Sequence, residues 1–173
     1  MIKLPSIQSL FSEIAATTKR FPLSVLSAVL MTTSFIYLTR EGWKVSEEHA
    51  FFWAKLSMCG ALGLSFSLAT SLLAEAKGYS RNGKILTQVI TFCIVLVYYF
   101  TINNYEEFNL DSFTQFSLYI IAAHLFVAFA PFIGANRING FWQFNKTLFF
   151  RSLLSGLYTT VLYGGIALAF WLI

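Results

Sequence analysis

Five long stretches of the chain contain no charged residue, and they constrain the fold more than any other feature. They cover residues 21–39, 56–74, 85–105, 112–136 and 152–173. A helix rises about 1.5 Å per residue, so about 20 residues cross the roughly 30 Å hydrocarbon core of a bilayer. The pattern predicts one all-α integral membrane domain, 1–173: a bundle of five transmembrane helices plus one or two interfacial amphipathic helices. The expected spans are about 21–39, 54–74, 85–103, 113–135 and 152–173.

Composition excludes the other broad classes. Charged residues make up 12% of the chain, whereas soluble domains contain about a quarter. Nineteen Phe residues and a positive mean hydropathy are incompatible with disorder. The lipid bilayer is therefore an expected partner and nucleic acid is not, although the net charge is +4.

The second stretch differs from the others in its polarity. Residues 85–102 contain eleven Leu, Ile, Val or Phe residues, whereas residues 56–74 contain seven, together with four serines and a threonine. Each of these apolar residues favours insertion by roughly 0.3–0.6 kcal/mol, so insertion of the second stretch alone is marginal. We expect this span to be enclosed by the others.

The basic residues predict an orientation. With five crossings and a cytoplasmic N-terminus, nine Lys and Arg residues lie inside and three (Arg40, Lys44 and Lys55) lie outside. Omitting the second crossing inverts this ratio. The chain is therefore expected to have its C-terminus on the opposite side of the membrane from the cytoplasm.

Two segments are expected to lie on the membrane rather than to cross it. In the segment 1–19, Ile7, Leu10, Phe11 and Ile14 follow helical spacing with polar residues between them, which is typical of an interfacial helix; a frayed terminus is the alternative. In residues 136–150, Asn and Lys alternate with Phe and Trp, which favours the headgroup boundary.

Rows of small residues at i, i+4 spacing predict helix-packing faces, because close contact in lipid depends on such residues. The last span carries Ser152, Gly156, Thr160 and Gly164. The second carries Gly63, Ser67 and Ser71, and the first carries Ser24, Ala28 and Thr32.

His124 is the one ionisable side chain expected at membrane depth other than the cysteines and tyrosines. It belongs to a small and polar stripe with Thr114, Ser117, Ala128 and Pro131, so we expect it to point inward. A proton-relay or ligand role is one interpretation. A neutral imidazole bonded to a carbonyl or hydroxyl of a neighbouring span is the other. Pro131 is expected to kink this span.

No catalytic, metal-ligand or phosphate-loop motif accompanies His124. Cys59 and Cys93 lie in apolar spans and are interpreted as packing thiols. We expect no catalytic residue, metal or cofactor, although the residues do not decide whether the chain is an enzyme.

The segments His124–Phe132, Asn139–Lys146 and Leu148–Arg151, with Arg20–Leu23, resemble a signature of the domain-of-unknown-function family numbered 4153, common among Bacteroidetes. The resemblance implies a bacterial, multi-pass inner-membrane protein of unknown activity. In such a membrane, the orientation predicted from the basic residues makes the C-terminus periplasmic. Similar proteins continue into further spans, so the chain is expected to be a short member or the N-terminal part of a longer protein. The resemblance directs attention to His124, Asn139, Trp142, Gln143, Asn145 and Lys146.

Three functions are compatible with these patterns. The packing faces favour a structural or interaction subunit that contacts other membrane subunits or a second copy. A transporter or proton-coupled sensor component using His124 is the first alternative. An interfacial enzyme acting on a lipid-linked substrate through Asn139, Gln143, Asn145 and Lys146 is the second.

Overall fold

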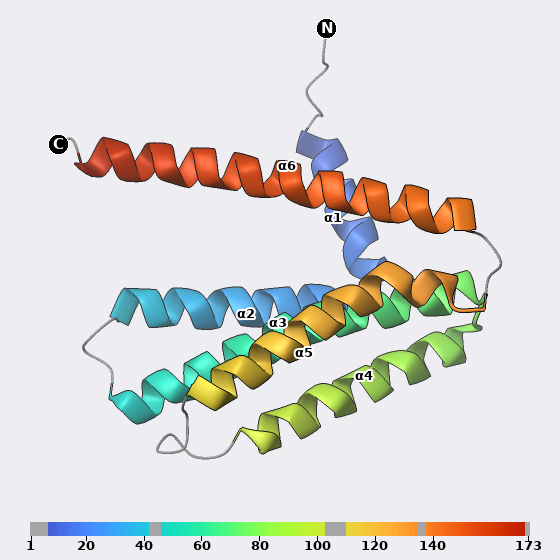
Figure 1. Cartoon of the computed structure of the whole chain (residues 1–173), viewed down its shortest axis with the longest axis horizontal. Coiled ribbons are helices and arrows are strands. Elements are labelled where there is room, and N and C mark those ends of the chain that lie inside the picture. Colours follow the sequence, from blue (N-terminus) through green and yellow to red (C-terminus); the bar gives the residue numbers. More distant parts are fainter. Residues whose placement is uncertain (1–6, 42–45, 103–109, 135–137, 172–173) are drawn as a thin grey trace, which may run out of the picture. The chain divides into compact units, whose positions relative to one another are not determined.

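A computed structural model describes residues 7–41, 46–102, 110–134 and 138–171, and these contain helices and turns but no strand. The elements in chain order are α1 (Ile7–Arg20), α2 (Pro22–Glu41), α3 (Glu47–Ala76), α4 (Arg81–Thr101), α5 (Leu110–Phe129), the short 3-10 helix η3 (Ala130–Phe132) and α6 (Ile138–Trp171) (Figure 1). The chain forms two compact units, 1–133 and 134–173, and each is described by itself.

Five helices among the described residues are long and apolar enough to cross a membrane. They lie in the ranges Pro22–Arg40, Glu47–Ala76, Arg81–Thr101, Ser112–Phe132 and Ile138–Ala169. The expected all-α class and the number of spanning helices are confirmed. Two spans are longer than expected: α3 begins at Glu47, and α6 continues without interruption through the region that was expected to form a separate interfacial segment.

The helix α3 is the centre of residues 1–133. The helices α2, α4 and α5 all pack against it (Figure 1). A larger share of α3 is buried than of these three neighbours. Its buried residues include three of its serines, Ser65, Ser67 and Ser71. The expectation that this span, with few Leu, Ile, Val and Phe residues and many hydroxyls, is enclosed by the others is confirmed for this unit. Packing against protein removes the cost of exposing hydroxyls to lipid.

The contact between α2 and α3 is built from small residues. Ser24 Oγ lies 2.7 Å from Ser67 Oγ, and a Cβ added to Gly60 would lie 2.8 Å from the backbone nitrogen of Met31. On α2 the buried residues are Ser24, Ser27 and Ser34. Of the predicted row, Ser24 is buried and Ala28 is half-buried in this unit, whereas Thr32 is exposed. The residues of α2 that contact α3 are spaced alternately by three and four positions, which is the spacing found in left-handed helix pairs.

Pro131 ends the regular part of the fourth span. The α-helix stops at Phe129, and residues 130–132 tighten into η3 before Gly134 adopts a positive φ of 70°. A proline cannot donate the backbone hydrogen bond that would continue the helix. In place of the expected kink, the α-helix ends two residues before Pro131.

The helix α1 lies crosswise to α2 (Figure 1). Its described side chains are exposed, and among them are the large apolar residues Phe11 and Ile14. A helix of this kind, set across the spans, is suited to the plane of the headgroups.

Candidate functional site: a basic pocket at the helix ends

The ends of three spans meet at one cavity in the unit 1–133. The helix α2 begins there at Pro22, α3 ends at Ala76 and α4 begins at Arg81. Between α3 and α4 the chain turns within four residues: Gly78 has a φ of 65°, and Tyr79 N donates to Ala74 O at 2.9 Å. The positive φ favours glycine, which has no Cβ to clash with the backbone.

An ion pair joins the last residue of α1, Arg20, to the last turn of α3. Arg20 Nε and Nη2 donate to Glu75 Oε1 and Oε2 at 2.8 and 2.6 Å. The hydrogen bonds and the negative charge of Glu75 raise the pKa of Arg20 above its ordinary value, so the guanidinium stays charged. The Arg20 side chain is 58% exposed, and such pairs stabilise a fold only weakly. The bidentate geometry orients the corner between α1 and α2.

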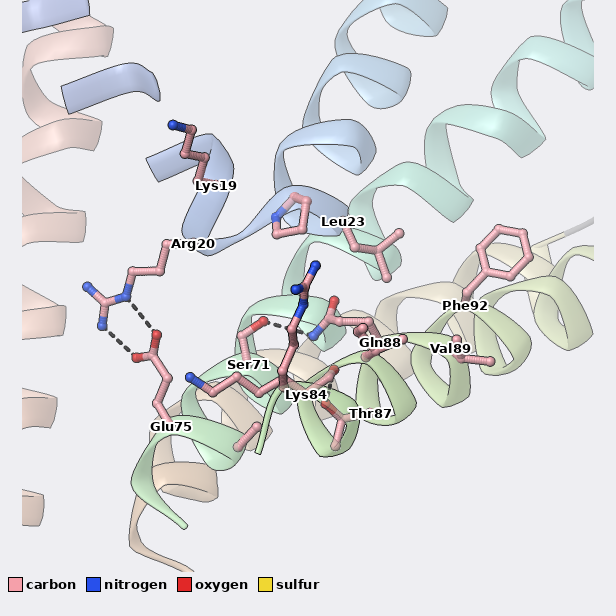
Figure 2. A pocket seen from close by; sticks show the side chains of 14 residues that line it. Lys19, Arg20, Leu23, Ser71, Glu75, Lys84, Thr87, Gln88, Val89 and Phe92 are labelled. Atoms are coloured by element: carbon pink, nitrogen blue, oxygen red, sulfur yellow. Dashed lines mark hydrogen bonds and ion pairs between the residues drawn. The ribbon is translucent and has the colours of Figure 1, made fainter. Parts of the chain in front are cut away.

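A cavity of about 520 Å³ opens beside this ion pair (Figure 2). Its volume lies within the range of small-molecule sites. Four cationic side chains and one acidic side chain line it: Lys19, Arg20, Arg81, Lys84 and Glu75. Apolar side chains form another part of the wall: Pro22, Leu23, Ala74, Ile85, Val89 and Phe92. The cavity therefore combines positive charge with apolar surface.

Polar side chains between α3 and α4 form a further part of this wall. Ser71 and Gln88 line the cavity, and Gln88 Nε2 donates to Ser71 Oγ at 2.9 Å (Figure 2). Beyond the cavity, one turn farther along α4, the hydroxyls of Thr91 and Thr70 lie 2.9 Å apart. Gln88 Oε1 is buried and has no hydrogen-bond partner in the described part of the chain. A buried acceptor without a donor is costly, so this oxygen is suited to receive a donor from a bound molecule.

The structure places His124 on the exposed side of α5 within residues 1–133. The buried residues nearby are Ala123, Val127 and Ala130, one position away from the predicted stripe. His124 Nδ1 lies 2.7 Å from the carbonyl oxygen of Ile120, which is in the same helix. The inward orientation and the bond to a neighbouring span are therefore not found in this unit.

The remaining predicted site residues lie in the first turns of α6. Trp142, Gln143, Asn145 and Lys146 line one open depression together with Phe149. Asn145 Nδ2 donates to Phe141 O at 2.9 Å within the helix. Asn139 is exposed and does not line this depression. The structure thus brings four of the five α6 candidates to one surface.

The predicted packing residues fall into two groups. Gly63, Ser67 and Ser71 are buried where α3 meets its neighbours, and a Cβ added to Gly63 would lie 2.7 Å from Ser27 Oγ. On α6, Ser152, Gly156, Thr160 and Gly164 lie along one side of the helix, and nothing lies within 4 Å of a Cβ added to Gly156 or Gly164.

The described residues contain no group of three or more His, Cys, Asp or Glu side chains that could hold a metal ion. Cys59 is buried and Cys93 is exposed, and both are free thiols. The pocket at the helix ends brings four cations, polar atoms and a cavity together. Sequence reasoning used its four cations for orientation alone and did not predict the pocket.

These features define the chain as a multi-pass α-helical membrane protein. No family model matches the sequence, no curated protein matches it, and no solved structure matches it. Membership in the family of unknown function named above therefore stays a prediction.

Proposed function

We propose that the chain is a structural or interaction subunit of a membrane assembly. The observation that supports this proposal is the row of small residues on α6, Ser152, Gly156, Thr160 and Gly164. The same kind of residue makes the helix contacts of α3, where Gly60, Gly63 and Ser67 meet α2. In lipid, helices associate through close backbone approach rather than through hydrophobic burial. The row on α6 is thus suited to contact a helix of a second copy or of another membrane subunit.

Replacing Gly156 and Gly164 together with leucine tests this proposal. Two isobutyl groups would hold any partner helix away from α6, so we expect the double variant to lose its association by at least about tenfold, the equivalent of 1.4 kcal/mol. Association is measured from the mass of complexes containing the intact chain on native gels after extraction in a mild detergent.

Gly165→Leu is the matched control, because residue 165 lies on the side of α6 away from the row. This variant is expected to keep the wild-type mass distribution. A wild-type chain that runs only as a 19.5 kDa monomer with no companion protein would contradict the proposal.

We also propose that the chain resides in a bacterial inner membrane with a cytoplasmic N-terminus and a periplasmic C-terminus. The nine-to-three distribution of basic residues supports this orientation. Four of the nine, Lys19, Arg20, Arg81 and Lys84, line the pocket at one end of the unit 1–133.

Cysteine labelling of intact cells tests the orientation. In a background where alanine replaces Cys59 and Cys93, Ser46→Cys and Lys77→Cys place single thiols before and after α3, at exposed positions. We expect a membrane-impermeant maleimide to label Ser46→Cys in intact cells and Lys77→Cys only after lysis. The reverse result would invert the topology.

A further inference from the structure

We propose that the pocket at the ends of α2, α3 and α4 binds the phosphate headgroup of an anionic glycerophospholipid. This inference goes beyond an assembly role and does not depend on it. It rests on the positive charge of the cavity, on the depth of the cavity in the membrane, and on a lining that is cationic in one part and apolar in another.

The charge of the pocket is complementary to a phosphate diester. Four cationic side chains and one carboxylate line it, and Glu75 is already engaged by Arg20. Lys19, Arg81 and Lys84 form no salt bridge in the part of the chain that the structure describes. Figure 2 shows Lys84 reaching from α4 along the side of the pocket where Glu75 lies. The first turn of α4, which begins at Arg81, adds the positive end of a 21-residue helix.

The depth of the pocket matches the headgroup layer. The candidate spans of α2 and α4 begin at Pro22 and Arg81, and that of α3 ends at Ala76. The cations of the pocket therefore lie at the boundary between the spans and water, where basic residues between transmembrane helices recognise anionic lipid headgroups.

The apolar part of the lining distinguishes a lipid from a free phosphate ester. Ile85, Val89 and Phe92 of α4 line the cavity and are 53%, 51% and 55% exposed. They continue from the cationic end toward the middle of the span, along the path that an acyl chain follows. A soluble phosphate compound would leave this surface without a partner, so the lining favours a lipid.

The unpaired oxygen of Gln88 favours an anionic lipid whose headgroup carries a hydroxyl. It lies one helical turn deeper along α4 than Lys84 and accepts no hydrogen bond in the described residues. A headgroup hydroxyl would supply the missing donor if the Gln88 amide turned this oxygen toward the cavity. Phosphatidylglycerol carries both the phosphate and such hydroxyls, and it is the probe for the test.

The test compares lipid binding by the intact chain and by the Arg81→Gln/Lys84→Gln variant, using native mass spectrometry from detergent micelles with added phosphatidylglycerol. Each basic residue near anionic lipid contributes about fivefold in affinity, so we expect the double variant to bind about 25-fold more weakly. Binding of zwitterionic phosphatidylcholine is expected to be weak and equal in both proteins.

Lys77→Gln/Arg151→Gln is the matched control, because it removes two cations that do not line the cavity. It is expected to bind phosphatidylglycerol within about twofold of the wild type. Equal losses in the two double variants would overturn the pocket as the site. Displacement of the lipid by equimolar soluble glycerol phosphate would overturn a lipid as its ligand. We expect both variants to fold, because all four replaced side chains are exposed. Circular dichroism checks this.

Discussion

Replacing Gly60 with leucine is expected to break the contact between α2 and α3 and to destabilise the folded chain by about 3 kcal/mol or more. A Cβ at this position would lie 2.8 Å from the backbone nitrogen of Met31 and 2.9 Å from the carbonyl oxygen of Ser27. These are backbone atoms, so rotation of a side chain cannot relieve the clash. The helix α2 must move as a whole, which also separates Ser24 from Ser67.

The folded fraction is measured in mixed micelles as the proportion of sodium dodecyl sulfate increases. Gly165→Leu is the control, since nothing lies within 4 Å of a Cβ added to Gly165. The alanine variants sharpen the comparison. Alanine favours a helix over glycine by about 1 kcal/mol, so Gly165→Ala should stabilise the chain while Gly60→Ala destabilises it. If both alanine variants shifted stability in the same direction, the close approach at Gly60 would be disproved.

The number of spanning helices was predictable from the sequence because the signal is one-dimensional. Uncharged stretches of about 20 residues are set by bilayer thickness, and their count needs no knowledge of neighbours. The enclosure of α3 was predictable for a related reason. Hydroxyls such as those of Ser67 and Ser71 require protein partners in a low-dielectric environment, so a span rich in them must lie among other helices.

Which side of each helix is buried was harder to predict. Apart from Ser24, the buried residues of α2 and α5 lie one or two positions from the predicted rows, as Ser27 and Ala123 show. Small and polar residues occur on more than one side of both helices. Which side is buried depends on the crossing of the helices, and hence on contacts such as Gly60 with Met31, which a sequence pattern does not specify.

The basic pocket was missed because its residues had another explanation. Lys19 and Arg20 are separated from Arg81 and Lys84 by 60 residues, and the positive-inside rule accounts for all four. Five crossings already place the start of α2, the end of α3 and the start of α4 on one side of the membrane. The additional information in the structure is the packing of α3 against both neighbours, which brings these ends to one cavity.

Replacing Lys55 with methionine is expected to destabilise the contact between α3 and α4 by about 2 kcal/mol, because hydrogen bonds to charged groups contribute about 1.5–3 kcal/mol. Lys55 Nζ donates to the carbonyl oxygen of Ile102 at 2.6 Å and lies 4.1 Å from the centre of the Tyr99 ring. The last carbonyls of a helix have no intrahelical donor, and a cation there also complements the helix dipole. Methionine keeps an unbranched stem but removes the three N–H donors and the charge.

The same detergent titration measures this effect, and Lys77→Met is the control because Lys77 is exposed at the turn after α3. A double-mutant cycle with Tyr99→Leu separates the two contributions. If the ammonium interacts with the ring, the two substitutions together should cost less than the sum of their separate costs, by about 0.5–1 kcal/mol. Additive losses would assign the whole effect to the carbonyl of Ile102. If Lys55→Met and Lys77→Met were equally stable, neither contact of Lys55 would hold α4 to α3. The hydroxyls of Thr70 and Thr91 and the amide of Gln88 would then be the polar contacts that link these helices in the described part of the chain.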